Sequence, residues 1–136
     1  MDFVTFEIAK KLKEKGFNCE LPYAMYNEIG QFCLLTTSAP YHVCESGYKY
    51  REYYDYNDFD KYDFIAPTID QVLKWLREAK RIDAGSVWDN RDGKWIGYIN
   101  EMDMPDLVGE YVLPNTYYSY EKAAIAVIEY VLDNLI

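Results

Sequence analysis

Hydrophobic residues recur at helical spacing near the middle of the chain. This apolar stripe consists of Ile69, Val72, Leu73 and Leu76. Pro67 disfavours helical structure for the residue before it, and the hydroxyl of Thr68 is suited to cap the amides of a first turn. Gln71 follows Thr68 at the spacing of a capping box. The pattern predicts a buried helix that begins at Thr68 and ends at the basic pair Lys80-Arg81.

Two further apolar stripes predict helices at the ends of the chain. The first stripe contains Val4, Ile8 and Leu12, and the last contains Ala124, Val127, Ile128, Val131 and Leu135. We expect the first helix to cover residues 3–15, with Asp2 as its cap and Gly16 as a left-handed stop. We expect the last helix to cover residues 120–134, with Ser119 as its cap.

Between the first two helices the pattern is typical of strands separated by turns. The expected strands are residues 23–26, 31–36, 41–44, 48–56 and 62–65. The longest of them places an aromatic set on one face, namely Tyr48, Tyr50, Tyr54 and Tyr56, together with Glu52. A chain reversal between Ser38 and Ala39 places Cys33 opposite Cys44.

A hairpin follows the central helix, with strands at residues 86–89 and 94–99 around a turn at residues 90–93. A four-residue loop pairs Asp89 with Lys94 and Trp88 with Trp95. Both pairs favour the same register, one as an ion pair and one as an aromatic pair. Residues 100–115 lack a periodic pattern and are predicted to be irregular.

The order of these elements predicts the fold class. Helix, strands, helix, hairpin and helix give the order α-ββ-α-ββ-α, and hairpins between helices are typical of antiparallel α+β proteins. A chain of 136 residues is the length of one ordinary domain. We therefore predict one α+β domain over residues 1–136, with an antiparallel sheet or sheets packed against three helices.

Charge disfavours one class of function. The net charge is −9, and residues 83–136 hold ten acidic against three basic side chains. Direct nucleic-acid binding needs a basic surface, so this composition argues against it. An acidic composition most often serves solubility, and the alternatives are binding to a basic partner and mimicry of a nucleic acid.

The sequence also predicts the cellular setting. The N-terminus has no basic region followed by an apolar run, and the longest apolar run, residues 123–128, is far too short to span a membrane. Three cysteines do not form a disulfide framework. We expect a cytoplasmic, reduced protein that does not bind membranes.

Catalytic and metal-binding patterns are weak. His42 is the single histidine, and Cys19, Cys33 and Cys44 match no spacing of a zinc site, so packing roles are favoured over a metal or a cysteine nucleophile. Four acids, Glu101, Asp103, Asp106 and Glu110, suit a solvated rim better than a paired-carboxylate site. Phosphate-binding glycine loops and hydrolase motifs are absent from the sequence. We expect no enzyme activity, no metal and no cofactor.

Aromatic side chains are the strongest candidates for binding. The chain has fifteen tyrosines and three tryptophans. The candidate contact residues are Tyr48, Tyr50, Tyr54, Tyr56, Trp88 and Trp95. Their rings can stack on bases or sugars or anchor a protein partner. Burial beneath the helices is favoured for the tryptophans, whereas for the tyrosine face burial and partner binding are equally favoured.

Three segments resemble a group of uncharacterised small proteins from gut anaerobes and their mobile elements. The segments are APTIDQVLKWLRE at residues 66–78, EIAKKLKEKGF at residues 7–17, and the last helix from Tyr120 to the C-terminus. This resemblance implies an α+β domain in which fixed helices carry variable strands, and it implies no activity.

A more limited resemblance is to HicB-type antitoxins. Pro105-Asp106-Leu107 and Gly109 precede a helix that opens with Ser119, Glu121 and Ala124. Our first hypothesis is a non-catalytic module that uses the tyrosine-rich strand face to bind a protein or a second copy of itself. The second is an acidic decoy or antitoxin-like inhibitor of a basic or nucleic-acid-binding protein. An enzyme or carbohydrate binder built on the tryptophans and the loop at residues 101–110 ranks last.

Overall fold

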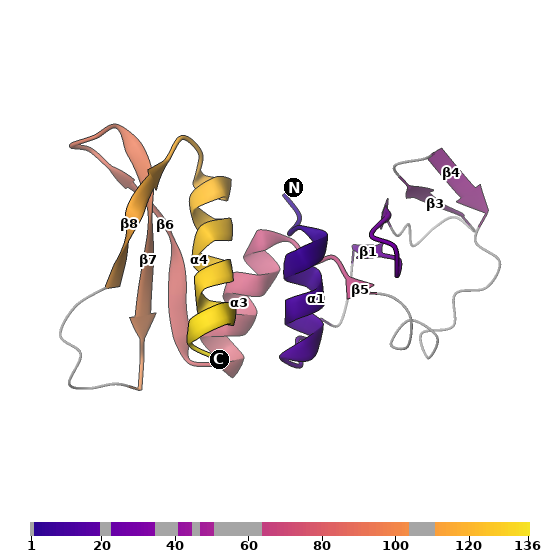
Figure 1. Ribbon diagram of the computed structural model, residues 1–136, viewed down its shortest axis with the longest axis horizontal. Coiled ribbons are helices and arrows are strands. Elements are labelled where there is room, and N and C mark those ends of the chain that lie inside the picture. Colours follow the sequence, from indigo (N-terminus) through magenta and orange to yellow (C-terminus); the bar gives the residue numbers. More distant parts are fainter. Residues whose placement is uncertain (1, 20–22, 35–40, 45–46, 51–63, 104–110) are drawn as a thin grey trace. The chain divides into compact units, whose positions relative to one another are not determined.

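The computed structural model describes residues 2–19, 23–34, 41–44, 47–50, 64–103 and 111–136. It confirms an α+β fold with three helices and two antiparallel sheets among these residues (Figure 1). The predicted order of helix, strands, helix, strands and helix is also confirmed. Backbone contacts divide the chain into two compact units, residues 3–68 and residues 69–136 with Asp2. A single domain over the whole chain stays a prediction.

The first unit contains a five-stranded sheet and helix α1 (Phe6–Glu14). Its strands are β1 (Ala24–Tyr26), β2 (Phe32–Leu34), β3 (Tyr41–Cys44), β4 (Gly47–Tyr50) and β5 (Phe64–Ile65), in the spatial order β4-β3-β2-β1-β5. All neighbouring strands are antiparallel. The predicted strands are therefore present where the chain is described, and residues 51–63, which include most of the predicted fourth strand, lie outside it.

The β1–β2 turn forms as predicted at residues 27–30. The side-chain oxygen of Asn27 accepts hydrogen bonds from the amides of Ile29 and Gln31, at 3.1 and 2.9 Å. Such side-chain-to-backbone bonds are the reason that asparagine favours turns. Gly30 has a φ of +87°, and a Cβ atom there would lie 2.9 Å from the ring of Phe6. Glycine is thus required at this position both by the backbone and by α1.

The first helix begins later than predicted. Thr5, and not Asp2, is the cap, and its hydroxyl accepts a hydrogen bond from the amide of Ile8. The preceding residues are extended because Phe3 forms a bridge with Thr68, and the Val4 amide donates to the Pro67 carbonyl. Pairing with a distant part of the chain therefore overrides the local helix signal.

The end of α1 confirms the predicted glycine stop. Gly16 has a φ of +80°, and its amide donates to Lys13 while the Phe17 amide donates to Leu12. These two bonds make a Schellman motif, which satisfies the last carbonyls of the helix.

Aromatic rings pack α1 onto its sheet. Phe6 contacts Tyr26 and Phe64, each with ring centroids 5.5 Å apart, and Tyr26 also contacts Phe32 at 5.4 Å. The hydroxyl of Tyr26 donates a hydrogen bond to the Val4 carbonyl at 2.6 Å, so the ring packs against its neighbours while its polar hydroxyl has a partner. The buried aliphatic residues of this unit are Val4, Ile8, Ala9, Leu12, Ala24, Met25 and Ala66.

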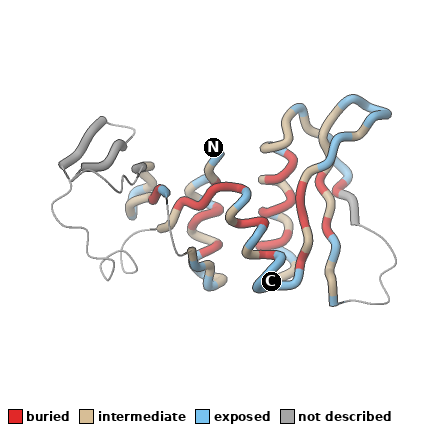
Figure 2. Tube along the Cα trace, turned by 180° about the vertical axis from the view of Figure 1, so that it is seen from behind, coloured by how far each residue is buried: buried red, intermediate tan, exposed pale blue. Residues whose placement is uncertain are grey.

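The second unit is a three-stranded sheet with helices on one face (Figures 1 and 2). Its elements are α3 (Ile69–Ala79), β6 (Ile82–Asp89), β7 (Lys94–Glu101), β8 (Tyr111–Tyr117) and α4 (Tyr120–Asn134), with strand order β6-β7-β8. The register places Asp89 opposite Lys94 and Trp88 opposite Trp95, which confirms the predicted hairpin. Its strands are longer than predicted.

Both helices bury the predicted apolar stripes, with one exception. The buried residues of α3 are Ile69, Val72, Leu73 and Leu76. Those of α4 are Ala123, Ala124, Val127, Ile128, Val131 and Leu132, and Ser119 caps the helix by accepting a bond from the Lys122 amide. Leu135 is only half-buried because the helix ends before it, at Asn134. The capping roles of Thr68 and Gln71 stay predictions.

The prediction of irregular structure over residues 100–115 is wrong in part, because β7 continues to Glu101 and β8 begins at Tyr111. The pattern of β8 is hidden by a bulge. Ile96 pairs with Thr116 and Tyr98 with Val112, so three residues of β8 around Pro114 stand opposite Gly97 alone. Proline is tolerated here because β8 is an edge strand of this sheet.

Gly97 sets the distance between α4 and the sheet. A Cβ atom at this position would overlap the Cγ2 atom of Val127 and would lie 3.2 Å from Leu113 Cδ1. On the opposite face, Gly85 is covered by the ring of Tyr98, and a Cβ there would lie 3.1 Å from its hydroxyl. The two glycines thus differ in what they contact, since one meets a helix and the other a movable side chain.

We predict that Gly97→Ala destabilises the protein by about 3 kcal/mol, because an added methyl group overpacks the helix–sheet interface. Gly85→Ala is the matched control and should stay within about 1 kcal/mol of the wild type, since the Tyr98 ring can turn aside. Urea unfolding followed by circular dichroism measures both. Equal effects of the two substitutions would contradict the role of Gly97.

Candidate functional site

The candidate site lies at the turn end of the β6–β7 hairpin. The turn is held by Asp89, whose carbonyl accepts a bond from the Gly93 amide at 2.9 Å and whose carboxylate accepts one from the Arg91 amide at 3.0 Å. Gly93 has a φ of +63°, which favours glycine. A tight turn at this point fixes the register of the two strands and hence the aromatic residues beside it.

Three aromatic rings form the hairpin cluster, which we define as Trp88, Trp95 and Tyr120. Trp88 meets Trp95 edge to face, with centroids 5.4 Å apart and an interplanar angle of 71°. Trp95 in turn meets Tyr120 at 5.5 Å and 89°. Tyr120 is the first residue of α4, so the cluster joins the hairpin to the start of that helix. Edge-to-face pairs of this kind add about 0.5–1.5 kcal/mol each beyond their buried area.

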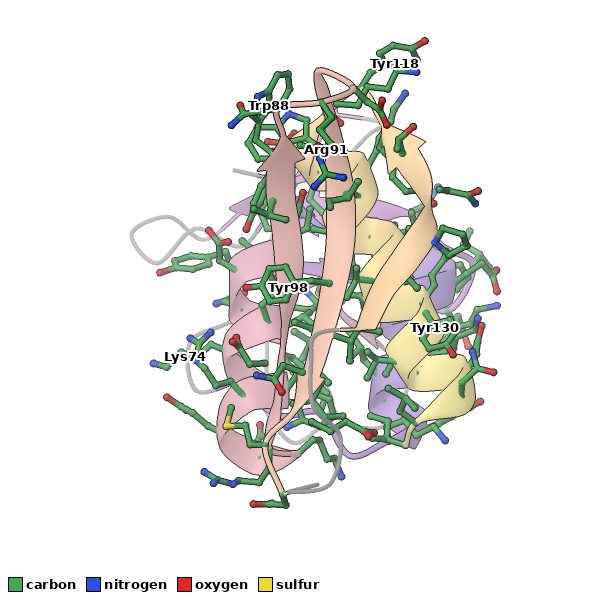
Figure 3. The ribbon with its side chains drawn as sticks, turned by 90° about the vertical axis from the view of Figure 1, so that its left-hand side faces the viewer. Lys74, Trp88, Arg91, Tyr98, Tyr118 and Tyr130 are labelled. Carbon is green, nitrogen blue, oxygen red and sulfur yellow. The ribbon has the colours of Figure 1, made fainter. Side chains whose placement is uncertain are left out.

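The cluster is exposed at its outer end, so the prediction that the tryptophans are buried is wrong for Trp88. Trp88 retains 47% of its surface and Val87 44%. Tyr118, just before the α4 cap, retains 84%, and the Lys94 ammonium lies 5.1 Å from the centre of its ring. Figure 3 shows Trp88 and Tyr118 at the same end of the sheet. Val87, Trp88 and Tyr118 are thus exposed at the end of the sheet where the basic residues Arg91 and Lys94 also lie.

The sheet face turned away from α4 is also partly apolar. Val87 pairs with Ile96 on this face, and Tyr98 pairs with Gly85. Figure 3 looks onto this face, with Tyr98 in front of the strands. Trp88 and Trp95 alternate with these residues and belong to the other face, on which Trp95 meets Tyr120 of α4, so apolar residues lie on both faces of the sheet at the hairpin end.

Tyr120 has a perturbed acidity. Burial raises the pKa of the Tyr120 hydroxyl above its usual value of 10.0, and the carboxylates of Asp70 and Glu121 raise it further. All three influences disfavour the phenolate. The hydroxyl is therefore protonated at neutral pH, and it is not an activated acid or base.

The arrangement supplies stacking and apolar contact, with few groups for proton transfer. The charged side chains at the turn end are Asp89, Arg91, Asp92 and Lys94, and all lie on or beside the turn. Within the described ranges, no group of three or more histidine, cysteine or acidic side chains is placed to hold a metal ion.

The structure brings the two predicted tryptophans together, and the described tyrosines of the predicted face belong to the other unit. Trp88 and Trp95 lie in the second unit, whereas Tyr48 and Tyr50 lie on β4 in the first. Those two tyrosines share one face of β4, opposite Val43 and Tyr41 of β3. Tyr54 and Tyr56 are outside the described residues, so the four-residue tyrosine face stays a prediction.

The other candidate sets are only partly assembled. Cys33 lies opposite Cys44, as the predicted reversal requires. Among the predicted acids, Asp103 lies 3.4 Å from the Nε atom of Arg81, while Asp106 and Glu110 lie outside the described residues. The Asp103–Arg81 pair is exposed and contributes little to stability.

Sequence reasoning missed Tyr118, Tyr120 and Lys94 as parts of this site. A local signal existed, because Tyr117-Tyr118 directly precedes the cap of a well-marked helix. What the pattern does not contain is the position of that helix start beside the hairpin turn, since this depends on tertiary packing.

Comparisons of the chain with protein-family models, with curated proteins and with solved structures find no match. The resemblances noted from the sequence therefore stay predictions. Among the helices within the described ranges, none has both the length and the apolar character that a membrane crossing requires.

We predict that Tyr120 makes stability fall at alkaline pH. Its pKa is raised on folding, so the folded state keeps a proton that the unfolded chain releases near pH 10. The stabilising effect is complete below pH 10 and is lost as the pH rises through the folded-state pKa. Tyr120→Phe should remove this loss, seen as a shallower fall of the urea midpoint between pH 9 and 11 (roughly the titration range of tyrosine).

Tyr118→Phe is the control for this experiment, because Tyr118 is 84% exposed. It should follow the wild-type pH dependence. A wild type and a Tyr120→Phe variant with parallel pH profiles would contradict the assignment.

Proposed function

We propose that this protein is a non-catalytic, cytoplasmic protein-interaction module whose principal contact surface is the exposed end of the β6–β7 hairpin. The observation that carries the proposal is Trp88, a half-exposed ring held in place by Trp95, which itself packs on Tyr120 of α4. Tryptophan and tyrosine dominate the energy of protein interfaces, because they bury much apolar area with few rotatable bonds.

The distribution of exposed side chains supports this choice. Five large hydrophobic residues are exposed among the described residues, and three of them, Val87, Trp88 and Tyr118, belong to this end of the second unit. Tyr23 and Ile29 of the first unit are the other two; Ile29 lies in the β1–β2 turn, and Tyr23 lies just before β1, at its other end. Single exposed apolar residues are ordinary, whereas a group of them is typical of contact surfaces.

Preorganisation is the second argument. The Trp88 ring contacts Trp95, and the strands that carry the two rings pair along eight residue positions. A partner would therefore bind a ring that is already ordered, and would lose less conformational entropy on binding. The tyrosines Tyr48 and Tyr50 on β4 are proposed as a further contact surface of the first unit.

We predict that Trp88→Ala abolishes specific partner capture, or self-association if the partner is a second copy, while leaving the fold intact. The loss should be at least about 2 kcal/mol of binding free energy, the threshold of a hot-spot residue. Tyr23→Ala is the matched control, since Tyr23 is 48% exposed and Trp88 47%. Affinity capture with quantitative mass spectrometry measures binding of a partner, and sedimentation over a range of concentrations measures self-association.

Circular dichroism of each variant separates lost binding from lost folding. The proposal fails if Trp88→Ala captures the same proteins as the wild type, or if neither capture nor concentration-dependent sedimentation detects an associate of the wild type.

The alternative is an acidic decoy or antitoxin-like inhibitor of a basic or nucleic-acid-binding protein. The observation that favours it is the excess of ten acidic over three basic side chains in residues 83–136. Several of these acids are exposed, among them Asp103, which follows β7, and Glu129 and Asp133 on α4. The resemblance to HicB-type antitoxins involves the same acidic half of the chain, because part of it lies at the Ser119 cap and at Glu121 and Ala124 of α4.

Salt distinguishes the two functions. Binding by an acidic decoy should weaken steeply as ionic strength rises from low values to roughly 1 M, where the Debye length is about 3 Å. Binding anchored by Trp88 should change little over the same range. We therefore propose to measure partner capture at low and high salt with both the wild type and Trp88→Ala. Capture that is lost at high salt but kept in Trp88→Ala would favour the decoy.

A further inference from the structure

The five-stranded sheet of the first unit contains two cysteines in register. Cys33 on β2 is the cross-strand partner of Cys44 on β3. The same transverse row continues to Met25 on β1, which pairs with Cys33, and to Gly47 on β4, which pairs with Cys44. Directly opposite residues of antiparallel strands belong to one face of the sheet, so the two cysteines share a face.

This register meets the first geometric requirement of a disulfide. Directly opposed residues in antiparallel strands have Cα atoms about 4.5–5.5 Å apart, and disulfides join Cα atoms about 4.4–6.8 Å apart. Neither strand needs to shift for the bond to form. Cys19 lies after the end of α1 and belongs to no strand of this sheet.

The strands that carry this pair also hold a histidine and a lysine in register. His42 lies two residues before Cys44 on the same strand, and its cross-strand partner is Lys49 of β4. Exchange itself proceeds through the thiolate, which is the form of cysteine that attacks a disulfide.

We propose that Cys33 and Cys44 form a reversible cross-strand disulfide when the chain meets a small-molecule disulfide oxidant. One cysteine thiolate attacks the oxidant, forms a mixed disulfide and releases one small thiol. The second thiolate then attacks the cysteine sulfur of that mixed disulfide, forms the Cys33–Cys44 bond and releases the second small thiol. The protein loses two electrons and two protons, and the oxidant gains both.

The consequence is a redox-controlled link between β2 and β3. These strands share two register pairs, Cys33 with Cys44 and Leu34 with Val43, so their backbone pairing is short. A covalent bond across this ladder would limit separation of the strands. In a reducing compartment the bond is absent, and its formation reports a more oxidising one.

The test uses the full chain with Cys19→Ser, so that Cys33 and Cys44 are the two remaining thiols. The reduced protein is treated with oxidised glutathione in buffer and in concentrated urea, then alkylated and weighed by mass spectrometry. We expect both thiols to disappear in buffer, with a monomer lighter by two hydrogen atoms, faster closure than in urea, and recovery by dithiothreitol. Adding Cys33→Ser to this variant should leave one thiol that is alkylated or carries glutathione.

Several results would overturn the proposal. These are two thiols that stay open to alkylation after oxidation, a stable glutathione adduct in place of the internal bond, and cross-links between chains. Closure at the same rate in urea would also overturn it, because the register would then play no part. So would thiols of the reduced protein that react only after a metal chelator is added.

Discussion

The close approach of α4 to the central strand of its sheet is the constraint on which the second unit depends. Gly97 allows this approach, because any side chain at that position would occupy the space of Val127. The helix position then fixes where its first residue, Tyr120, meets Trp95. Packing in the core and the presentation of the aromatic rings at the hairpin end are thus parts of one geometry, and both depend on the absence of a single methyl group.

The two units use different means to join helix and sheet. In the second, aliphatic side chains of α3 and α4 form the buried layer, and the sheet contributes small residues such as Ala84 and Gly97. In the first, α1 is held by rings, with Phe6 between Tyr26 and Phe64. The ammonium groups of Lys10 and Lys13 lie over two of these rings, at 4.7 and 4.9 Å from the centroids of Phe6 and Phe64. A cation over the face of an aromatic ring is attracted by the ring's quadrupole, so these contacts add to the ring packing that holds α1.

Elements marked by local chemistry were predictable from the sequence, and elements set by distant contacts were not. The Ser119 cap and the Asp89–Lys94 register follow from neighbouring residues, so α4 and the hairpin agree with their predictions. The start of α1 was missed because Phe3 pairs with Thr68. Strand β8 was missed because its bulge breaks the alternation on which strand prediction relies. For the site, the pairing of the tryptophans was predictable, but their exposure depends on where α4 begins.

The bulge in β8 has a consequence for assembly. An edge strand offers its unpaired amides and carbonyls to any other extended chain, and this edge-to-edge pairing is a common route to aggregation. Pro114 has no amide hydrogen to offer, and the extra residues around it interrupt the even spacing that a docking strand would need. Growth of a sheet into a fibre requires that both edges accept strands. Because the bulge and Pro114 prevent regular pairing at the β8 edge, the second unit is a poor building block for open-ended aggregates, even though the unit exposes aromatic rings.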